Sequence, residues 1–159
     1  MLGMYGDYEI KKATQDEVYI LSPKVCDMEA LELWQLFHID IETMLTILFE
    51  DEKQEIYSLY FQGEIIGMGG LAPLNGLGLH CAEIWFLGEN LINHQRFLVQ
   101  YGKQIIQKSL EKFPILLNQT AAWNKKTLRM VKYLGFIIDE KYLRFGCEKI
   151  LFKRFYITK

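Results

Sequence analysis

The sequence has few cysteines, and their spacing fits neither a metal site nor a disulfide framework. Its three cysteines, Cys26, Cys81 and Cys147, lie far apart in the 159 residues and form no CxxC pair. Structural zinc sites and small disulfide-bonded domains need paired or closely spaced cysteines. The three histidines share no metal-ligand spacing either. We therefore expect no zinc site and no disulfide framework.

The chain also lacks an excess of charge of one sign. Eighteen Lys and Arg residues against twenty Asp and Glu residues give a formal net charge of −2. Proteins that bind nucleic acid or anionic membranes attract phosphate groups with a basic surplus. We therefore expect no nucleic-acid partner and no binding to an anionic membrane through the overall charge.

Long hydrophobic runs are missing as well. The longest apolar stretch, residues 65–79, contains Pro73, Asn75 and five glycines. It is too short to span a bilayer. The first ten residues show neither the basic start nor the apolar core of a secretory signal. We therefore expect a cytoplasmic protein.

What is present is the profile of one soluble globular domain spanning residues 1–159, with 50% apolar and 24% charged residues. Alternating apolar residues predict strands, and apolar residues three or four apart predict helices. In chain order, the patterns predict a strand at 8–13, helices beginning near 14, 28 and 41, strands at 55–62, 65–74 and 79–88, a helix at 97–113, a strand at 115–123, a helix at 125–134 and strands at 136–140 and 148–157. This order predicts a mixed α/β domain.

Local signals mark several helix ends. Thr14 and Glu17 fit a capping box, Asp40 and Asn124 fit N-caps, and Gly135 fits a C-terminal stop. The first strand, at 8–13, is expected at an edge of the sheet. The helix from about Met28 is expected to turn an apolar stripe inward, formed by Leu31, Trp34 (with Leu33) and Phe37. All three tryptophans are expected in the core: Trp34, Trp85 and Trp123.

The segment "CAEIWFLGENLINHQRF", residues 81–97, joins a strand to a helix through a polar loop. The N-terminus of a helix presents free backbone N–H groups and the positive end of a dipole, so such a loop can hold a phosphate. Glu83 lies inside the strand between apolar neighbours, where desolvation would raise the pKa of its carboxyl toward the range of a general base. Alternatively, Glu83 pairs with a cation or points away from the sheet.

The element order, together with "NKKTLRMVKYLGF" at residues 124–136, resembles the GNAT acyltransferases. In that family an Asn cap, a short amphipathic helix, a Gly and a Phe lead into the next strand. The run from Glu83 to Phe136 is most similar to the GNAT-like proteins of short-tailed phages called internal virion protein A. The resemblance implies a mixed α+β fold with a central, mostly antiparallel sheet of about six or seven strands, flanked by about four or five helices.

The resemblance also implies a site. Glu83 matches the strand that carries the catalytic glutamate in some histone-type GNAT enzymes. The cofactor would be acetyl-CoA and the second substrate an amine. The residues implied in cofactor binding follow the same strand or cap the later helix: Phe86, Leu87, Gly88, Asn93, His94, Gln95, Arg96 and Asn124.

Two departures from the family stand out. Its pyrophosphate loop is patterned QxxGxG or RxxGxA, whereas "ENLINHQRF" has no glycine, and Glu89 adds a negative charge. The family's acid Tyr lies seven positions after the Asn cap, and that position is Val131. In the simpler interpretation, Asn93 only caps a helix and Arg96 is solvated. The basic face of the helix after Asn124 is also expected to be solvated: Lys125, Arg129 and Lys132.

Three functional classes follow from these patterns. The first is an acetyltransferase that moves an acetyl group from acetyl-CoA to an amine. The second is a catalytically inactive GNAT-fold protein, either in the virion or free in the host cytoplasm, that binds a host or phage protein through apolar residues of its N-terminal helices or of the loop at 87–92. The third is a protein that binds the cofactor as a sensor without chemistry.

Overall fold

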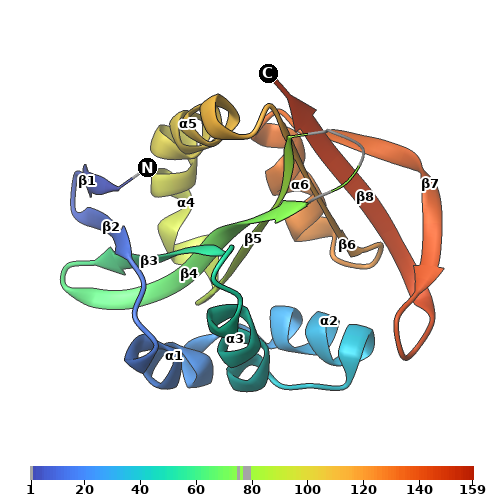
Figure 1. Cartoon of the computed structure of the whole chain (residues 1–159), viewed down its shortest axis with the longest axis horizontal. Coiled ribbons are helices and arrows are strands. Elements are labelled where there is room, and N and C mark those ends of the chain that lie inside the picture. The colour runs from blue at the N-terminus through green and yellow to red at the C-terminus, as the bar shows by residue number, and fades with distance from the viewer. Residues whose placement is uncertain (1, 75, 77–79) are drawn as a thin grey trace.

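One mixed sheet of eight strands runs through the chain in the order β1-β2-β3-β4-β5-β6-β8-β7 (Figure 1). The computed structural model describes residues 2–74, 76 and 80–159, and for Leu91 and Ile92 the backbone alone. The strands are β1 (Gly3–Tyr5), β2 (Tyr8–Lys12), β3 (Glu55–Phe61), β4 (Glu64–Leu74), β5 (Cys81–Gly88), β6 (Ile115–Ala121), β7 (Ile137–Phe145) and β8 (Ile150–Thr158).

The helices cover both faces of this sheet. The α-helices are α1 (Asp16–Leu21), α2 (Asp27–Phe37), α3 (Ile41–Glu50), α4 (Gln95–Phe97), α5 (Lys103–Lys112) and α6 (Lys125–Tyr133). One 3-10 turn, Ser22–Lys24, follows α1, and another, Leu91–His94, precedes α4; a π-helical turn, Leu98–Gly102, joins α4 to α5. Among the described residues, no helix has the length and apolar character needed to cross a bilayer.

The predicted order of elements is confirmed, with two differences. The short strand β1 pairs with β2, so the strand predicted at the edge lies one place inside it. The helix predicted at 97–113 begins earlier and contains the π-helical turn. The predicted start of β5 at Leu79 lies outside the described residues, as do most of the residues of the glycine-rich loop before it.

The sheet splits between β5 and β6, the fifth and sixth strands in its order. Seven neighbouring pairs make the sheet, and six of them are antiparallel. The exception, β5 with β6, is parallel and pairs only from Cys81 with Ile115 to Glu83 with Leu117. Beyond that point β5 continues to Gly88 and β6 to Ala121 without pairing to each other. We call this gap the opening, and Glu83 lies at its apex.

Each face of the sheet has its own apolar core. Helices α1, α2 and α3 pack on one face (Figure 1), where Val18, Leu21 and Leu45 are fully buried. Helices α5 and α6 pack on the other face around Leu110 and Leu116. Alternate residues of β5 therefore face different helices: Trp85 and Leu87 contact the α1–α3 layer, whereas Ala82 and Ile84 contact the α5–α6 layer.

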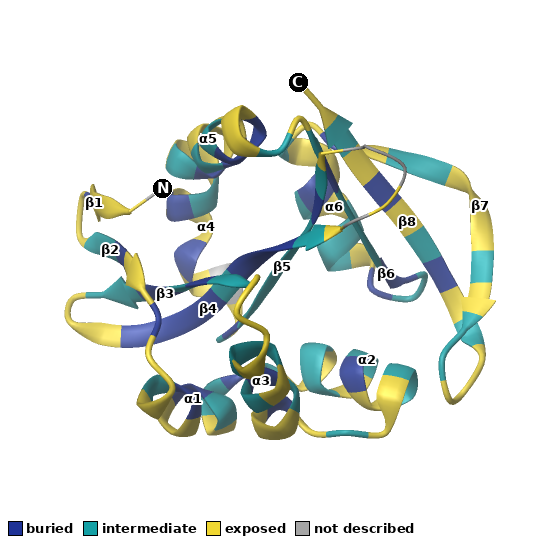
Figure 2. Cartoon of the chain, in the orientation of Figure 1, coloured by how far each residue is buried: buried dark blue, intermediate teal, exposed yellow. Residues whose placement is uncertain are grey.

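Helix α2 turns most of its predicted stripe to solvent, although Leu33 faces the sheet as expected. Three residues expected to face inward are exposed, with Leu31 at 48%, Trp34 at 49% and Phe37 at 51% of their full accessible area (Figure 2). The placement of Trp34 in the core was therefore wrong. The face turned toward the sheet carries Leu33 and two glutamates, which accept hydrogen bonds from the ends of β5 and β6. These polar contacts and the packing of Leu33 and Ala30 in the core together set the rotation of the helix.

The predicted caps of α3 and α6 are confirmed. The Asp40 carboxylate accepts from Thr43 N at 2.7 Å and the Asn124 side chain from Thr127 N at 3.2 Å. Gly135 follows α6 with a φ of 100°, a left-handed conformation that favours glycine at this position. The capping box before α1 is half formed: Glu17 accepts from Thr14 N, but no side chain caps the start of the helix.

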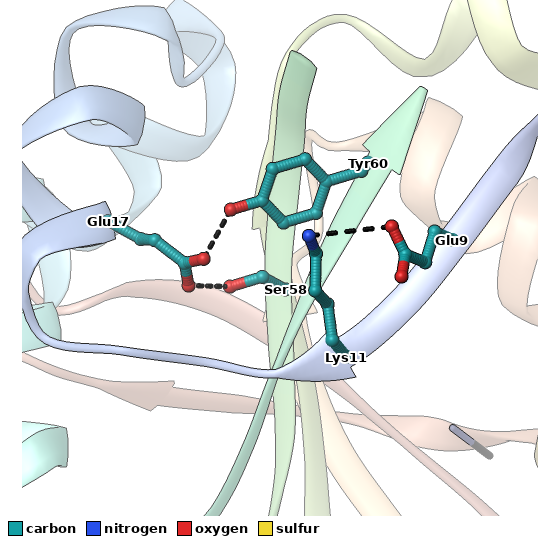
Figure 3. Close-up of polar contacts among 5 residues, drawn as sticks. All are labelled: Glu9, Lys11, Glu17, Ser58 and Tyr60. Carbon is teal, nitrogen blue, oxygen red and sulfur yellow. Dashed lines mark hydrogen bonds and ion pairs between the residues drawn. The ribbon is translucent and has the colours of Figure 1, made fainter. Parts of the chain in front are cut away.

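Glu17 also ties α1 to the sheet (Figure 3). Its carboxylate accepts a hydrogen bond from Ser58 at 2.6 Å and another from Tyr60, both on β3. Burial alone would raise the pKa of Glu17, but the hydrogen bonds from Ser58, Tyr60 and Thr14 outweigh it and lower the pKa below its ordinary value. Lys11 lies over the Tyr60 ring and pairs with Glu9 at 3.4 Å. The charged form of Glu17 is thus the form that the fold stabilises.

Replacing Glu17 with Gln should lower the free energy of unfolding by about 1–2 kcal/mol at pH 7, because an amide cannot accept three hydrogen bonds as a carboxylate does. The lowered pKa means that this stability is present above the unfolded pKa of Glu17 and is lost as the pH falls through its folded pKa. Urea unfolding at pH 7 and pH 3 would measure the difference. Glu9→Gln, which breaks an exposed ion pair, should change stability by less than about 0.5 kcal/mol. Equal losses in both variants would contradict a special role for Glu17.

Candidate functional site

A cavity of about 530 Å³ passes through the sheet at the opening between β5 and β6. This size is typical of small-molecule sites. Its wall contains residues from both faces of the sheet, and most of them are apolar. The polar groups on the wall are few, so they define the chemistry of the site: Glu29, Glu32, Gln54, Tyr57, Ser58, Glu83, Asn118, Gln119, Thr120, Asn124 and Thr127.

Glu83 lies on the cavity wall at the apex of the opening. It is the last residue of β5 that pairs with β6, and its neighbour on β4 is Ala72. Burial raises the pKa of its carboxyl, and no neighbouring charge contributes to the shift. Among the described residues, the Glu83 side chain has no hydrogen bond or ion pair. The alternative that it pairs with a cation is therefore wrong, and its carboxyl is free to accept a proton.

Asn118, on β6, holds the two strands together one residue beyond the apex. Its side-chain nitrogen donates to the Ile84 carbonyl at 2.6 Å, and its side-chain oxygen accepts from Gln119 N at 2.7 Å. The amide thus satisfies one backbone group on each side of the gap where the strand ladder ends. Asn118 was not predicted, because nothing in the sequence shows where two strands separate.

Glu32 holds the far end of β6. Its carboxylate accepts from Ala121 N at 2.9 Å, from the Thr120 hydroxyl at 3.0 Å and from the Asn124 side-chain nitrogen at 3.0 Å. Asn124 therefore has a further role beyond capping α6, because its amide nitrogen fixes α2 against β6. Glu32 was also not predicted.

Glu29, one helical turn before Glu32, holds the far end of β5. Its carboxylate accepts from Gly88 N at 2.9 Å. Burial raises the pKa of Glu29 to about 7, while the Gly88 N–H and the Cys26 thiol lower it in part. A Cβ on Gly88 would lie 2.7 Å from the Ile66 carbonyl oxygen, so glycine is needed there for close approach of the strands.

The residues predicted to bind the cofactor separate into two groups. Phe86, Leu87 and Asn124 lie on the cavity wall, and Gly88 ends the strand that forms one side of the opening. The other group points elsewhere. His94 is buried at 6% exposure, with its Nδ1 2.9 Å from the Tyr8 hydroxyl. Three further residues line a second hollow beside the N-terminal strands: Asn93, Gln95 and Arg96.

Lys126 supplies a cation at the rim of the opening. It is the second residue of α6, and its ammonium donates to the Asn90 side-chain oxygen in the loop after β5. Its charge also lowers the pKa of both Cys26 and Glu29, so it lies near the start of α2. Lys126 was not predicted, because it falls outside the three- and four-residue spacing of Lys125, Arg129 and Lys132.

These features test whether acetyl-CoA fits the chain. The long, apolar cavity suits an extended pantetheine arm, and Lys126 beside the loop after β5 suits a phosphate group. The Gly88 N–H, by contrast, is already bound by Glu29. Phe86, Leu87 and Asn124 are thus the predicted cofactor residues that line the cavity, and Lys126 is a cation beside the loop after β5.

Among the described residues, Tyr57 is the one tyrosine on the cavity wall. Val131, at the family position of the acid, is buried. Tyr133 is exposed and its hydroxyl lies 3.4 Å from the Val99 carbonyl. Tyr57 lies on the cavity wall, but its hydroxyl donates a hydrogen bond to Glu55 at 2.9 Å. Burial is the larger cause and this hydrogen bond the next that raise the pKa of Tyr57 to about 12.

Comparison with solved structures identifies the fold. The spermidine N-acetyltransferase from Vibrio cholerae in complex with CoA and spermine matches with a TM-score of 0.72 and 13% identity over 96% of this chain and 95% of that one. A ribosomal-protein-alanine N-acetyltransferase from Brucella melitensis matches with a TM-score of 0.71 and 15% identity over 94% of this chain and 99% of that one. A chimera of the Vibrio cholerae enzyme SpeG and hSSAT gives 0.71 and 16% over 96% of both chains.

These neighbours are N-acetyltransferases of the GNAT fold, and the chain has this fold. The predicted fold class is therefore confirmed, with eight strands in place of six or seven. No protein-family model and no curated protein sequence matches the chain.

The raised pKa of Glu29 predicts a pH-dependent stability. In the unfolded chain Glu29 loses its proton near its ordinary pKa of 4.5, whereas in the folded chain it keeps the proton up to about pH 7. The free energy of unfolding should therefore fall as the pH rises from 4.5 to 7, by at most about 3 kcal/mol. Glu29→Gln keeps an acceptor for Gly88 N and removes this charge, so its melting temperature should exceed that of wild type at pH 8.

Melting curves at pH 5 and pH 8 would test this prediction, with Glu50→Gln, an exposed site on α3, as the matched control. The control should follow wild type at both pH values. A Glu29→Gln variant that melts below wild type at pH 8 would show that the carboxylate stabilises the fold in its charged form.

Proposed function

We propose that the protein transfers an acetyl group from acetyl-CoA to an amine, with Glu83 as the general base. The observation that carries the proposal is the position of Glu83: an unpaired, partly desolvated carboxyl at the apex of a cavity that passes through the sheet. The GNAT-fold neighbours support the reaction class, since one of them was solved with CoA and spermine.

In this reaction the cavity brings two reactants together from opposite faces of the sheet. Bound acetyl-CoA supplies an activated thioester. The amine nitrogen forms a bond to the acetyl carbon while the bond from that carbon to sulfur breaks. Glu83, or a water that it orients, takes the proton that the amine loses. Solvent protonates the departing thiolate, which is a good leaving group.

The remaining residues of the site bind and orient. Phe86 and Leu87 would line the path of the pantetheine arm, and Asn124 would contact it from the start of α6. Lys126 would offset the negative charge of the pyrophosphate. The turn 93–96 contributes backbone N–H groups at most, because its side chains line the second hollow or are buried.

Replacing Glu83 with Gln should lower the rate of acetyl transfer by about 10²-fold or more, the usual scale of a general base. The assay measures release of the CoA thiol with spermidine and with alaninamide as acceptors. In wild type the rate should rise with pH as Glu83 loses its proton. Glu148→Gln, on an exposed turn, is the control and should keep the wild-type rate. An unchanged rate in Glu83→Gln would exclude Glu83 as the base, and no release by wild type with either amine would contradict the proposed transfer.

Replacing Lys126 with Met should weaken acetyl-CoA binding about fivefold, since a partly exposed charge pair contributes about 1 kcal/mol. Saturating acetyl-CoA, at about a hundred times its Kd, should raise the wild-type melting temperature by about 5–10 °C. The variant should need a higher cofactor concentration for the same rise. Lys125→Met, its exposed neighbour, is the control and should behave as wild type. Identical titrations for both variants would exclude Lys126 from the phosphate site.

A second candidate function is a binding protein without catalysis, supported by the exposed apolar stripe of α2. We infer that this surface would contact a host or phage protein, either in the cytoplasm of an infected cell or in the virion of a short-tailed phage, as the sequence resemblance implies. Three exposed residues of the stripe, together with Met28 one turn before them, form this surface: Met28, Leu31, Trp34 and Phe37, each at least 39% exposed. A melting temperature that does not respond to acetyl-CoA, together with no acetyl transfer, would favour this function over the first.

A further inference from the structure

Two buried polar atoms on the cavity wall have no hydrogen-bond partner among the described residues. They are the indole Nε1 of Trp85, a donor, and the Oε1 of Gln54, an acceptor. Both residues line the cavity. Leaving a buried polar group without a partner costs about 1–3 kcal/mol, so such groups commonly mark a ligand site.

The strand register places these two residues beside Glu83 on the α1–α3 face. Gly70 pairs with Ile56 on one side and with Trp85 on the other. Two residues along β4, Ala72 pairs with Glu83, which lies two residues before Trp85 on the same face of β5. Glu55 pairs with Leu71, so Gln54 enters the sheet at the level of Ala72 and Glu83. The three polar groups thus surround a floor of two small residues, Gly70 and Ala72.

Gly70 determines where the indole lies. A Cβ at Gly70 would be 3.0 Å from the Trp85 carbon Cε2, which is bonded to Nε1, and 2.5 Å from the Glu55 carbonyl oxygen. The Cε2–Cζ2 edge of the indole, next to Nε1, therefore lies over Gly70. This close approach is compatible with glycine alone, because the Glu55 oxygen belongs to the backbone.

A donor and an acceptor on the wall of one cavity are complementary to an amide, which offers one C=O and one N–H. A protonated alkylamine or polyamine offers donors alone, so it would leave the Trp85 N–H without an acceptor. Residues two apart on a strand are about 7 Å apart. An amine held at Glu83 is therefore within one short substituent of the Trp85 and Gln54 groups.

We propose that Trp85 and Gln54 form an amide-recognition subsite, and that the acceptor is an amine next to an amide, as in an aminoacyl or peptide N-terminus. The proposal rests on the proposed acetyl transfer for the role of the amine. In the subsite, Trp85 Nε1 donates to the amide carbonyl oxygen, and Gln54 Oε1 accepts from the amide nitrogen. Specificity for amides over plain amines follows from the two groups that only an amide satisfies.

The indole N–H signals in ¹⁵N-labelled full-length protein test the subsite without relying on catalysis. The chain has three tryptophans, and loss of one signal in Trp85→Phe assigns the Trp85 resonance. Alaninamide should move this signal downfield, whereas 2-aminobutane, which has the same amine but no amide, should not. The Trp123 signal is an internal control, because its Nε1 already donates to Gln35 at 2.9 Å. The fitted affinity should favour alaninamide about tenfold, and Trp85→Phe or Gln54→Met should remove most of that preference.

Each outcome is decisive. A Trp85 signal that does not move with alaninamide, or moves equally with 2-aminobutane, would overturn the subsite and leave a polar niche filled by water. A shift with alaninamide, but no release of CoA thiol, would support the subsite and contradict the proposed transfer. Thiol release at equal rates from both amines, with an unmoved Trp85 signal, would support the transfer and contradict the subsite.

Discussion

The unpaired backbone N–H groups at the two sides of the opening are the constraint on which the rest of the site depends. Strands β5 and β6 separate after Glu83 and Leu117, so their far ends lack strand partners for Gly88 N and Ala121 N. A buried N–H without an acceptor costs free energy comparable to a lost hydrogen bond. Helix α2 supplies both acceptors, with Glu29 on one strand end and Glu32 on the other. One helix therefore bridges the opening and keeps the strands apart.

The orientation of α2 explains features that would otherwise look unrelated. Because its glutamates face the sheet, most of its apolar stripe faces solvent. The backbone N–H of Cys26 also donates to the Gly88 carbonyl at 2.9 Å, which fixes the start of the helix. The carbonyls of Gln35 and Leu36 accept from the turn between β7 and β8, which fixes its end. The helix is held at both ends and along its inner face mainly by polar contacts, and the cavity is the space that this arrangement leaves.

Three carboxyl groups face the cavity from the α1–α3 side, and their surroundings give them different roles. Glu32 is fully engaged by three donors. Glu29 accepts from Gly88 N, and burial raises its pKa to about 7. Glu83 has no partner among the described residues, so it is the carboxyl available to a substrate. A base must be free to accept a proton, and in this cavity that requirement selects Glu83 over its two neighbours.

The sequence predicts on which strand or helix several site residues lie, because strand and helix patterns locate a residue on an element. Glu83 was placed on its strand by alternation, and Asn124 at its cap by the helix that follows it. Lys126, Asn118, Glu29 and Glu32 were missed, since each acts on a segment at least 34 residues away in the chain. For the turn 93–96, which was predicted to bind the cofactor, the sequence did not give the directions of the side chains. Those directions depend on where the helix docks. His94 is directed toward Tyr8 rather than the opening.

The sequence by itself determined the order of the elements, the caps of α3 and α6 and the position of Glu83 within a strand, because these depend on local spacing and on residues three or four positions apart. Only the tertiary structure decided the rotation of α2, the gap between β5 and β6 and the grouping of Glu83, Trp85 and Gln54. Apolar periodicity predicts a rotation in which apolar side chains face the core. Here two unsatisfied backbone N–H groups and the packing of Leu33 and Ala30 together set the rotation, and those N–H groups arise only once two distant strands separate in space.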